Sequence, residues 1–288
     1  MASSSVSKSF FQTRSISFPS RSHSKTNQFE QQLYTLRSSQ AASTSSSSSV
    51  SHRLNSLKDL YDNADELLQL PSNQLLLSKN KHTKSIEEVL SGSLRLLEIC
   101  GTSRDVLQQS KERLQDIQSV LRRRSNGEFS IANEVTEYLN TRKKAKKTIK
   151  KCLRDIKEAH KNTETNAIVS MLKDTEAITT DNFKSFLSYI AGAKLQSQKS
   201  SWSAVSKLIS QSGNKEAAAL ISEFDIVDDT LDLLIQKKKT GINVSQVEDM
   251  KRQMIKLESE IQDFDEALEC LFRHLVRTRA TLLNILSN

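Results

Sequence analysis

The sequence predicts an all-α protein, an elongated bundle of long amphipathic helices with a coiled-coil-like C-terminal helix and a disordered N-terminal tail. Among its 288 residues are only six Gly and two Pro, the residues that tight turns need most. Aromatic residues make up 5%, which disfavours the packed faces of a β-sandwich. After residue 50, apolar residues recur at alternating steps of three and four, the period of one helix face. Together these features favour long helices joined by few connections.

The first 50 residues are rich in serine and are predicted to form a disordered tail, with a short helix around Phe29–Leu36. Residues 51–288 form the predicted helical domain. The first 29 residues contain no Asp or Glu and include several Lys and Arg, as in an organelle transit peptide. A plain disordered tail is the alternative interpretation and the one we favour.

A short motif in this tail suggests a phosphorylation site. The segment Arg14–Pro19 reads R-S-x-S-x-P, the pattern that 14-3-3 proteins bind when the second serine is phosphorylated. Ser17 is therefore a candidate phosphosite, and a 14-3-3 protein is a candidate partner. Unchanged phosphate-dependent binding in Ser17→Ala would contradict this hypothesis.

The first predicted helices are read from their apolar stripes. One runs from Val50 to Leu68 and ends before Pro71, because the residue before a proline is pushed out of the helical region. The next follows a loop near residues 78–84 and extends from Ile86 to Leu121, with Gly101 as a predicted weak point or break. It closes with basic residues and a glycine, which suit a helix C-terminus.

The middle of the chain predicts shorter helices. A seam that includes Tyr138, Arg142 and Ile149 runs from Ile131 to Ala159. Four further helices are predicted, with a break at 179–181 between the first two. They are Ile168–Ile178, Phe183–Ile190, Trp202–Ile209 and Ala217–Leu234.

The last helix has the longest regular seam, which runs from Val247 to Ile285 in unbroken steps of three and four, with Thr278 as its only polar member. A seven-residue period sustained over this length is typical of a coiled coil or a long bundle helix. The predicted helix runs from Val244 to Leu286 without Gly or Pro, and at 1.5 Å per residue it is about 65 Å long. Its seam must pack on other helices of the chain or on a second copy, so self-association through these C-terminal heptads is one predicted contact.

The sequence offers no catalytic constellation. The five histidines stand in no HExxH or ExxH pattern, and phosphate-binding loops and nucleophile elbows are missing. Cys100, Cys152 and Cys270 are far apart and odd in number, which indicates reduced thiols in an intracellular protein of the cytoplasm or nucleus. No apolar run approaches the roughly 18 residues of a transmembrane helix. We therefore expect neither an enzyme nor a cofactor or metal site.

The most distinctive charge feature is a basic run at residues 142–161. Ten Lys and Arg oppose two acids, so the run carries a charge of +8, equal to the formal net charge of the whole chain. Such a run repels itself unless something anionic is near. We take seven of its side chains as a candidate interaction patch: Arg142, Lys143, Lys144, Lys146, Lys147, Lys150 and Lys151.

Three interpretations of this run compete. Nucleic acid would attract it, but the run lacks aromatic residues for base stacking. An anionic membrane would also attract it, but the apolar side of the run lacks Trp and Phe. The third interpretation is a solvated face, or one paired inside the protein with the acids between Glu216 and Asp232. A nuclear-import signal at Lys143–Lys147 is also compatible with the pattern.

Several blocks in order along the chain resemble the plant-specific BYPASS-related family: Ser17–His23, Ser91–Glu98, Leu121–Arg124, Trp202–Leu208, Leu268–Arg279 and Leu282–Leu286. The resemblance implies a role in root and shoot development, in part through control of a mobile root-derived signal. It supplies no catalytic or ligand residues. Thr83-Lys84-Ser85 stands where the family usually has a tryptophan, and Ser91 stands where it usually has Asp.

The sequence as a whole favours a non-enzymatic regulatory or adaptor protein of plant root and shoot development that acts through helix-mediated protein contacts. The alternative is a binder of anionic surfaces, membrane lipid or nucleic acid, that uses the basic helix 142–161. Binding that is lost steeply with salt would favour the alternative. Salt-resistant binding through an apolar seam would favour the adaptor.

Overall fold

The computed structural model describes residues 21–42, 46–123, 131–157, 166–192, 222–236 and 244–287. Within these ranges all regular structure is helical, which confirms the predicted all-α fold. The helices are α1 (Arg21–Ala42), α2 (Ser47–Leu68), α3 (Pro71–Lys79), α4 (Lys84–Arg122), α5 (Ala132–Lys157), α6 (Ala167–Ala191), α9 (Glu223–Gln236) and α10 (Val244–Ser287). No helix in the described part of the chain is both long and apolar enough to cross a membrane.

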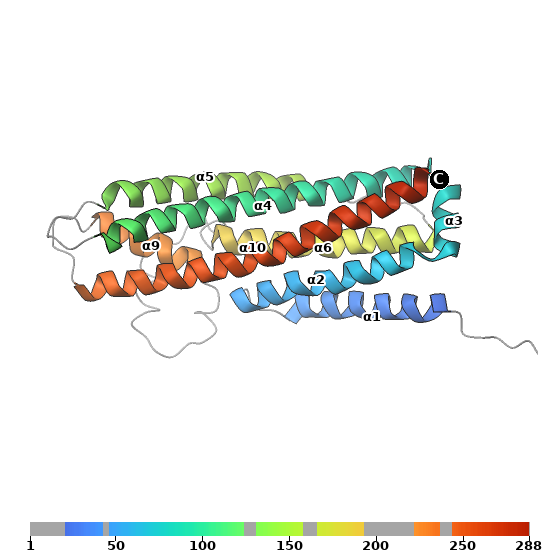
Figure 1. The fold of residues 1–288 in the computed structure, drawn as a ribbon, viewed down its shortest axis with the longest axis horizontal. Coiled ribbons are helices and arrows are strands. Elements are labelled where there is room, and N and C mark those ends of the chain that lie inside the picture. Colours follow the sequence, from blue (N-terminus) through green and yellow to red (C-terminus); the bar gives the residue numbers. More distant parts are fainter. Residues whose placement is uncertain are drawn as a thin grey trace, which may run out of the picture.

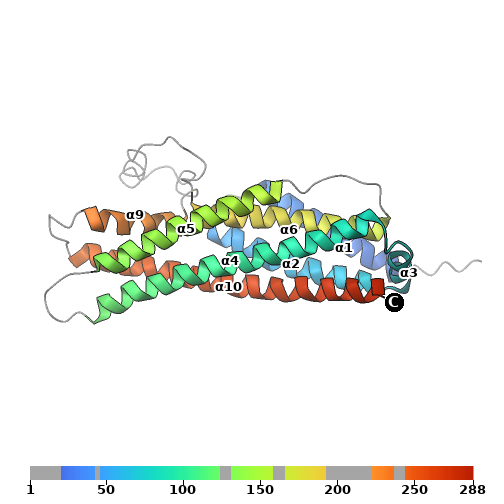
Figure 2. The ribbon, with the colours of Figure 1, turned by 90° about the horizontal axis from the view of Figure 1, so that it is seen from above.

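The helices form an elongated rod (Figure 1). Helix α10 runs along most of the rod, antiparallel to α4, and packs mainly against α4 and α2. Helix α1 lies on the outer side of α2, and the short α3 crosses the end of the rod where the C-terminus also lies. Seen from above, α4 and α5 form the upper layer, with α6, α9 and α10 behind them (Figure 2). The outer faces of α4 and α5 therefore lie on one side of the rod.

The seam of α10 is buried within the chain. Its apolar members are all at most 8% exposed from Met250 to Ile285, because α2, α4 and α9 cover them. The one polar member, Thr278, donates its hydroxyl hydrogen to Asp65 Oδ1 on α2 at 2.5 Å. Helices of the same chain already cover the predicted heptad seam, so self-association would need a different set of residues.

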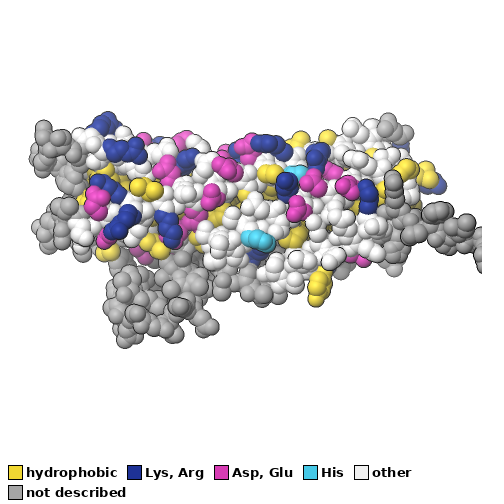
Figure 3. Space-filling view, turned by 60° about the horizontal axis from the view of Figure 1, so that its bottom comes forward, with side chains coloured by type: hydrophobic (Ala, Val, Ile, Leu, Met, Phe, Trp, Pro, Cys, Tyr) yellow, Lys and Arg dark blue, Asp and Glu magenta, His cyan; other side chains and the backbone are white. Residues whose placement is uncertain are grey.

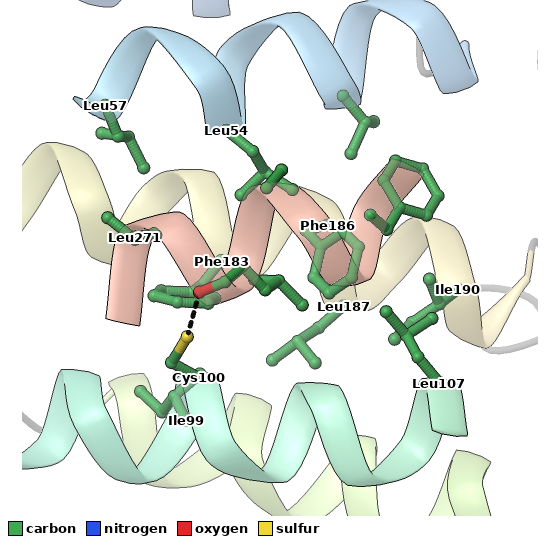
Figure 4. Close-up of a cluster of buried hydrophobic side chains, with 14 of the residues drawn as sticks. Leu54, Leu57, Ile99, Cys100, Leu107, Phe183, Phe186, Leu187, Ile190 and Leu271 are labelled. Atoms are coloured by element: carbon green, nitrogen blue, oxygen red, sulfur yellow. Dashed lines mark hydrogen bonds between the residues drawn. The ribbon is translucent and has the colours of Figure 1, made fainter. Parts of the chain in front are cut away.

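A cluster of buried apolar side chains lies where α2, α4, α6 and α10 meet (Figure 4). Phe186 and Phe264 pack edge to face with ring centroids 5.2 Å apart, and Tyr189 meets Phe264 in the same way. The buried Cys100 thiol donates to the backbone oxygen of Leu268 at 3.4 Å. Burial raises the pKa of this thiol to about 12, so Cys100 is an uncharged core residue.

Part of the predicted disordered tail is helical. Helix α1 occupies residues 21–42, longer than the short helix expected around Phe29–Leu36, and α2 begins at Ser47. Phe29, Leu33 and Leu36 lie on one face and are buried, because α2 and α6 pack against α1. These apolar residues at steps of four and three outweigh the serine-rich composition around them. Residues 1–20, which complete the predicted tail, lie outside the described residues.

Of three predicted helix breaks, the one before Pro71 is confirmed, because α2 ends at Leu68, and the other two differ from the structure. Pro71 stands in the first turn of α3, where a proline is tolerated because its missing N–H has no helical partner. Gly101 lies inside the continuous α4, and residues 179–181 lie inside the continuous α6. There the Thr179 hydroxyl donates to Thr175 O at 2.7 Å and lies 3.1 Å from the Tyr61 hydroxyl, so its polarity is satisfied. The predicted helix 202–209 lies outside the described residues.

Candidate functional site

Six cationic side chains lie exposed along the outer side of α5, and we call them the basic face: Lys143, Lys144, Lys147, Lys150, Lys151 and Arg154. None of them forms an ion pair with a carboxylate of the described residues. Five belong to the patch predicted from the sequence. The opposite side of α5 carries buried apolar residues such as Val135 and Ile149 that hold the helix on the rod. The fold thus presents these charges to solvent.

Arg142 departs from the predicted patch, because its side chain is only 1% exposed. Its Nε donates to Asp228 Oδ1 on α9 at 3.0 Å, and its Nη2 donates to the backbone oxygen of Ile190 on α6 at 2.8 Å. The Tyr138 hydroxyl donates to the same carboxylate at 2.9 Å, and Lys146 Nζ does so at 2.8 Å. The interpretation of the basic run as internally paired therefore holds for Arg142 and Lys146.

Electrostatics favour the charged form of this buried pair. Burial alone lowers the pKa of Arg142, but the Asp228 carboxylate outweighs it and the pKa is raised. Burial likewise raises the pKa of Asp228, and Arg142 and Lys146 reverse this and leave it below its ordinary value. The Arg142 guanidinium also lies over the Phe224 ring, 4.6 Å from its centroid. This cluster fixes α5 against α6 and α9.

The end of α6 is shaped to admit a second acid of α9. Gly192 follows the helix with a φ of +83°, a backbone conformation that favours glycine. A Cβ at this position would lie 1.9 Å from Asp225 Oδ1, so any larger residue would collide with that carboxylate. The Ser222 hydroxyl is 3.3 Å from Asp225 Oδ2 and accepts from the Asp225 N–H at 3.2 Å. Gly192 thus allows α9 to approach the end of α6.

Helix α4 carries an exposed row of acids beside the basic face. Glu98, Asp105 and Glu112 follow one another at steps of seven, and we call them the acidic row. Among the described residues, none of the three forms an ion pair. The upper layer thus has a negative strip on α4 and a positive strip on α5. On the lower side, by contrast, Lys and Arg are interspersed with Asp and Glu (Figure 3).

A polar cluster joins α2 to α10. Arg277 Nε donates to Asp65 Oδ2 and its Nη2 donates to Asp62 Oδ1, both at 2.5 Å. His274 Nδ1 lies 3.4 Å from Asp62 Oδ1, and burial lowers the pKa of His274. Asp65 is 5% exposed, so its carboxylate needs the hydrogen bonds that Arg277 Nε and the Thr278 hydroxyl donate to it. The cluster fixes the register of α10 on α2.

A small cavity of about 30 Å³ lies between α2, α4, α6 and α10 and is lined by Glu176, Tyr61 and Arg279. Its volume suits about one water molecule. Burial raises the pKa of Glu176 to about 7. A Cβ at Gly92 would lie 2.1 Å from the Glu176 carboxyl group, so this glycine of α4 leaves the room that the carboxyl occupies.

Other predicted residues are placed as follows. Ser17, together with the side chains of Lys157 and Lys161, lies outside the described residues. The free cysteines Cys152 and Cys270 are partly buried. The described part of the chain contains no group of three or more His, Cys, Asp or Glu able to hold a metal ion. The sequence indicated the acids between Glu216 and Asp232 as internal partners of the basic run, and Asp228 is the one that pairs with Arg142. The acidic row of α4 was missed, although its spacing of seven residues is visible in the sequence.

Comparison with known families agrees with the sequence blocks. The family model described as Protein BPS1 matches residues 53–285, which is most of the chain. The chain belongs to the BPS1 family. The suspected BYPASS-related membership is thereby confirmed, and with it a relation to plant development. No curated protein and no solved structure matches the chain.

The BPS1 blocks coincide with structural contacts. The block Ser91–Glu98 contains Gly92, which makes room for Glu176, and it ends with the first acid of the acidic row. The block Leu268–Arg279 supplies the Leu268 oxygen that accepts from Cys100 and the α10 side of the polar cluster. Membership of this family does not specify a molecular activity, so we infer one from the charged surfaces of the protein.

Proposed function

We propose that this BPS1 protein is a non-enzymatic regulatory or adaptor protein of plant root and shoot development, and that the basic face of α5 is its main contact surface for protein partners. The observation that carries the proposal is the set of six exposed cations without a carboxylate partner among the described residues. Like charges at helical steps of three and four oppose helix formation by a few tenths of a kcal/mol per pair. An anionic partner would remove that repulsion.

The surroundings of the basic face favour a protein as the partner. A flat membrane or a nucleic acid backbone would meet the acidic row of α4 as well as the lysines, and like charges repel. The basic face also contains no exposed large apolar side chain that could enter a membrane or stack on a base. A protein can offer acids opposite α5 and bases opposite α4. Such complementary strips give a contact its specificity.

The rival candidate uses the same cations on a purely anionic surface. Each lysine near an anionic membrane contributes about 1 kcal/mol of attraction, so six together would give measurable binding at low salt. The acidic row would weaken this attraction without abolishing it. The test must therefore separate proteins from lipids and nucleic acids.

The test is partner capture from plant tissue at low and at moderate salt. The intact protein is compared with a variant that carries Lys143→Gln, Lys144→Gln, Lys147→Gln and Lys150→Gln. Lys146 is left unchanged because it pairs with Asp228. A matched control removes four exposed lysines elsewhere: Lys58, Lys79, Lys81 and Lys84, each changed to Gln.

We expect a set of proteins that the intact chain and the control capture at low salt and that the basic-face variant loses; capture by the intact chain should weaken at moderate salt, because exposed charges are screened. Equal capture by all three baits would contradict the role of the basic face. Selective loss of lipid or nucleic acid, with protein capture unchanged, would favour the rival candidate.

A further inference from the structure

The two charged strips of the upper layer match each other along the rod. The acidic row spans residues 98–112, which precede residue 127 by 15 to 29 positions. The basic face falls within residues 142–156, which follow residue 127 by the same 15 to 29 positions. Helices α4 and α5 are antiparallel neighbours joined through residues 124–130, so equal separations from the connection place the strips at about the same level.

The two strips also share their spacing. The acids recur every seven residues, and so do Lys143 and Lys150, Lys144 and Lys151, and Lys147 and Arg154. Seven residues of α-helix rise about 10.5 Å, so both strips repeat their charge at the same interval. A partner whose charges have the same interval and opposite sign would match all of them together.

The strips do not neutralise each other within one molecule. No ion pair connects α4 with α5 among the described residues, although the helices are in contact. The side chains of the acidic row and of the basic face are all exposed. Their charges therefore remain available to another molecule.

We infer that this surface binds a second copy of the same chain. A two-fold axis parallel to the rod would place the basic face of each copy on the acidic row of the other, so that both strips are paired twice. This inference rests on the proposed role of the basic face as a contact surface and names one partner for it. A two-fold axis perpendicular to the rod would instead place α4 opposite α4 and α5 opposite α5, so that like charges face each other. The charge pattern therefore favours the axis parallel to the rod.

The contact is polar, so the dimer is expected to be weak and sensitive to salt. Leu94 is the only large apolar residue that is exposed on α4, and the described part of α5 has none. Exposed charges are screened over about 10 Å at 0.1 M salt. Dimerisation should therefore be visible at low ionic strength and decline steeply as salt is added.

Sedimentation velocity of the full chain tests the inference with a charge swap. One variant makes the basic face acidic by changing all six of its cations to Glu: Lys143, Lys144, Lys147, Lys150, Lys151 and Arg154. The other makes α4 basic through Glu98→Lys, Asp105→Lys and Glu112→Lys. Circular dichroism and thermal unfolding establish that both variants fold, which is expected because all nine changed side chains are exposed.

We expect the intact protein to form dimers at about 20 mM salt and to be monomeric at about 300 mM, where the Debye length is far shorter. Each variant alone should be monomeric at both salts, and an equal mixture should regain dimers because each strip again meets its opposite. Monomers of the intact protein at low salt, dimers of either variant alone, or a mixture that stays monomeric would overturn the inference. Protein capture that still depends on the basic face in a monomeric protein would leave the proposed function standing.

Discussion

The Arg142 guanidinium and the Asp228 carboxylate form a buried ion pair between α5 and α9, with Nε 3.0 Å from Oδ1 and the arginine only 1% exposed. Arg142 belongs to the same helix as the basic face, but its side chain is on the buried side of that helix. The pair therefore divides the basic run into an inner part that holds α5 in place and an outer part that is available to partners.

Removing one member of this pair should destabilise the fold strongly. We expect Arg142→Met to lower the free energy of unfolding by about 3–5 kcal/mol, because Asp228 would be left charged and buried. Urea unfolding measures this change. The exposed neighbour provides the control, since Lys143→Met should change stability by about 0.5 kcal/mol or less. Similar values for the two variants would show that the buried pair contributes nothing special.

Glu176 should make stability depend on pH. Its pKa is raised to about 7 in the folded protein by burial, so the fold favours the protonated carboxyl group. The stability gained from this group is complete below pH 4.5 and is lost as the pH rises through 7. Glu176→Gln should therefore be more stable than the intact protein at pH 8, by roughly 2 kcal/mol, and the two should converge near pH 4.5. Thermal unfolding at both pH values tests this, and equal effects at both would contradict it.

Two glycines should respond in opposite ways to alanine. Gly101→Ala should stabilise the protein by about 0.5–1 kcal/mol, because α4 continues through this position and an added Cβ meets nothing within 4 Å. Gly192→Ala should destabilise it by about 1–3 kcal/mol, because the backbone has positive φ and the Cβ would collide with Asp225. Chemical unfolding of the two variants side by side tests this. An unchanged Gly192→Ala protein would show that the end of α6 is not constrained.

The polar cluster between α2 and α10 predicts a graded response. Asp65→Ala should cost about 2–3 kcal/mol, since it leaves the Thr278 hydroxyl and the Arg277 Nε without their acceptor. Asp62→Ala should cost about 1 kcal/mol or less, because Asp62 is more exposed and its ion pair is screened by water. Unfolding in urea gives both values, and the reverse order would contradict the assignment of Asp65 as the central acceptor.

Much of the fold was predictable because long seams leave a regular pattern. The three-and-four steps of α10 identified its buried residues from Met250 to Ile285, and other helices of the chain cover them. Helix α1 was underestimated because serine-rich composition hid a stripe of only three apolar residues, whose burial depends on α2 and α6. A local sequence pattern does not show which distant helices will pack against an apolar stripe.

The basic run shows the same limit for the candidate site. Arg142 stands on the seam of α5 as well as in the basic run, so its position predicted both burial and exposure. Its partners Asp228 and the Ile190 oxygen come from helices more than 40 residues away, and only the fold brings them together. The exposed lysines were predictable because the helical period places them opposite that seam.

The central claim is that the basic face of α5 is the surface through which this protein acts, and complementation tests it most directly. A plant line whose root or shoot growth is altered by loss of this protein would receive the intact gene, the variant with Gln at Lys143, Lys144, Lys147 and Lys150, or the matched control variant. With equal protein levels, we predict that the intact gene and the control restore growth and that the basic-face variant does not. Full restoration by the basic-face variant would contradict the claim.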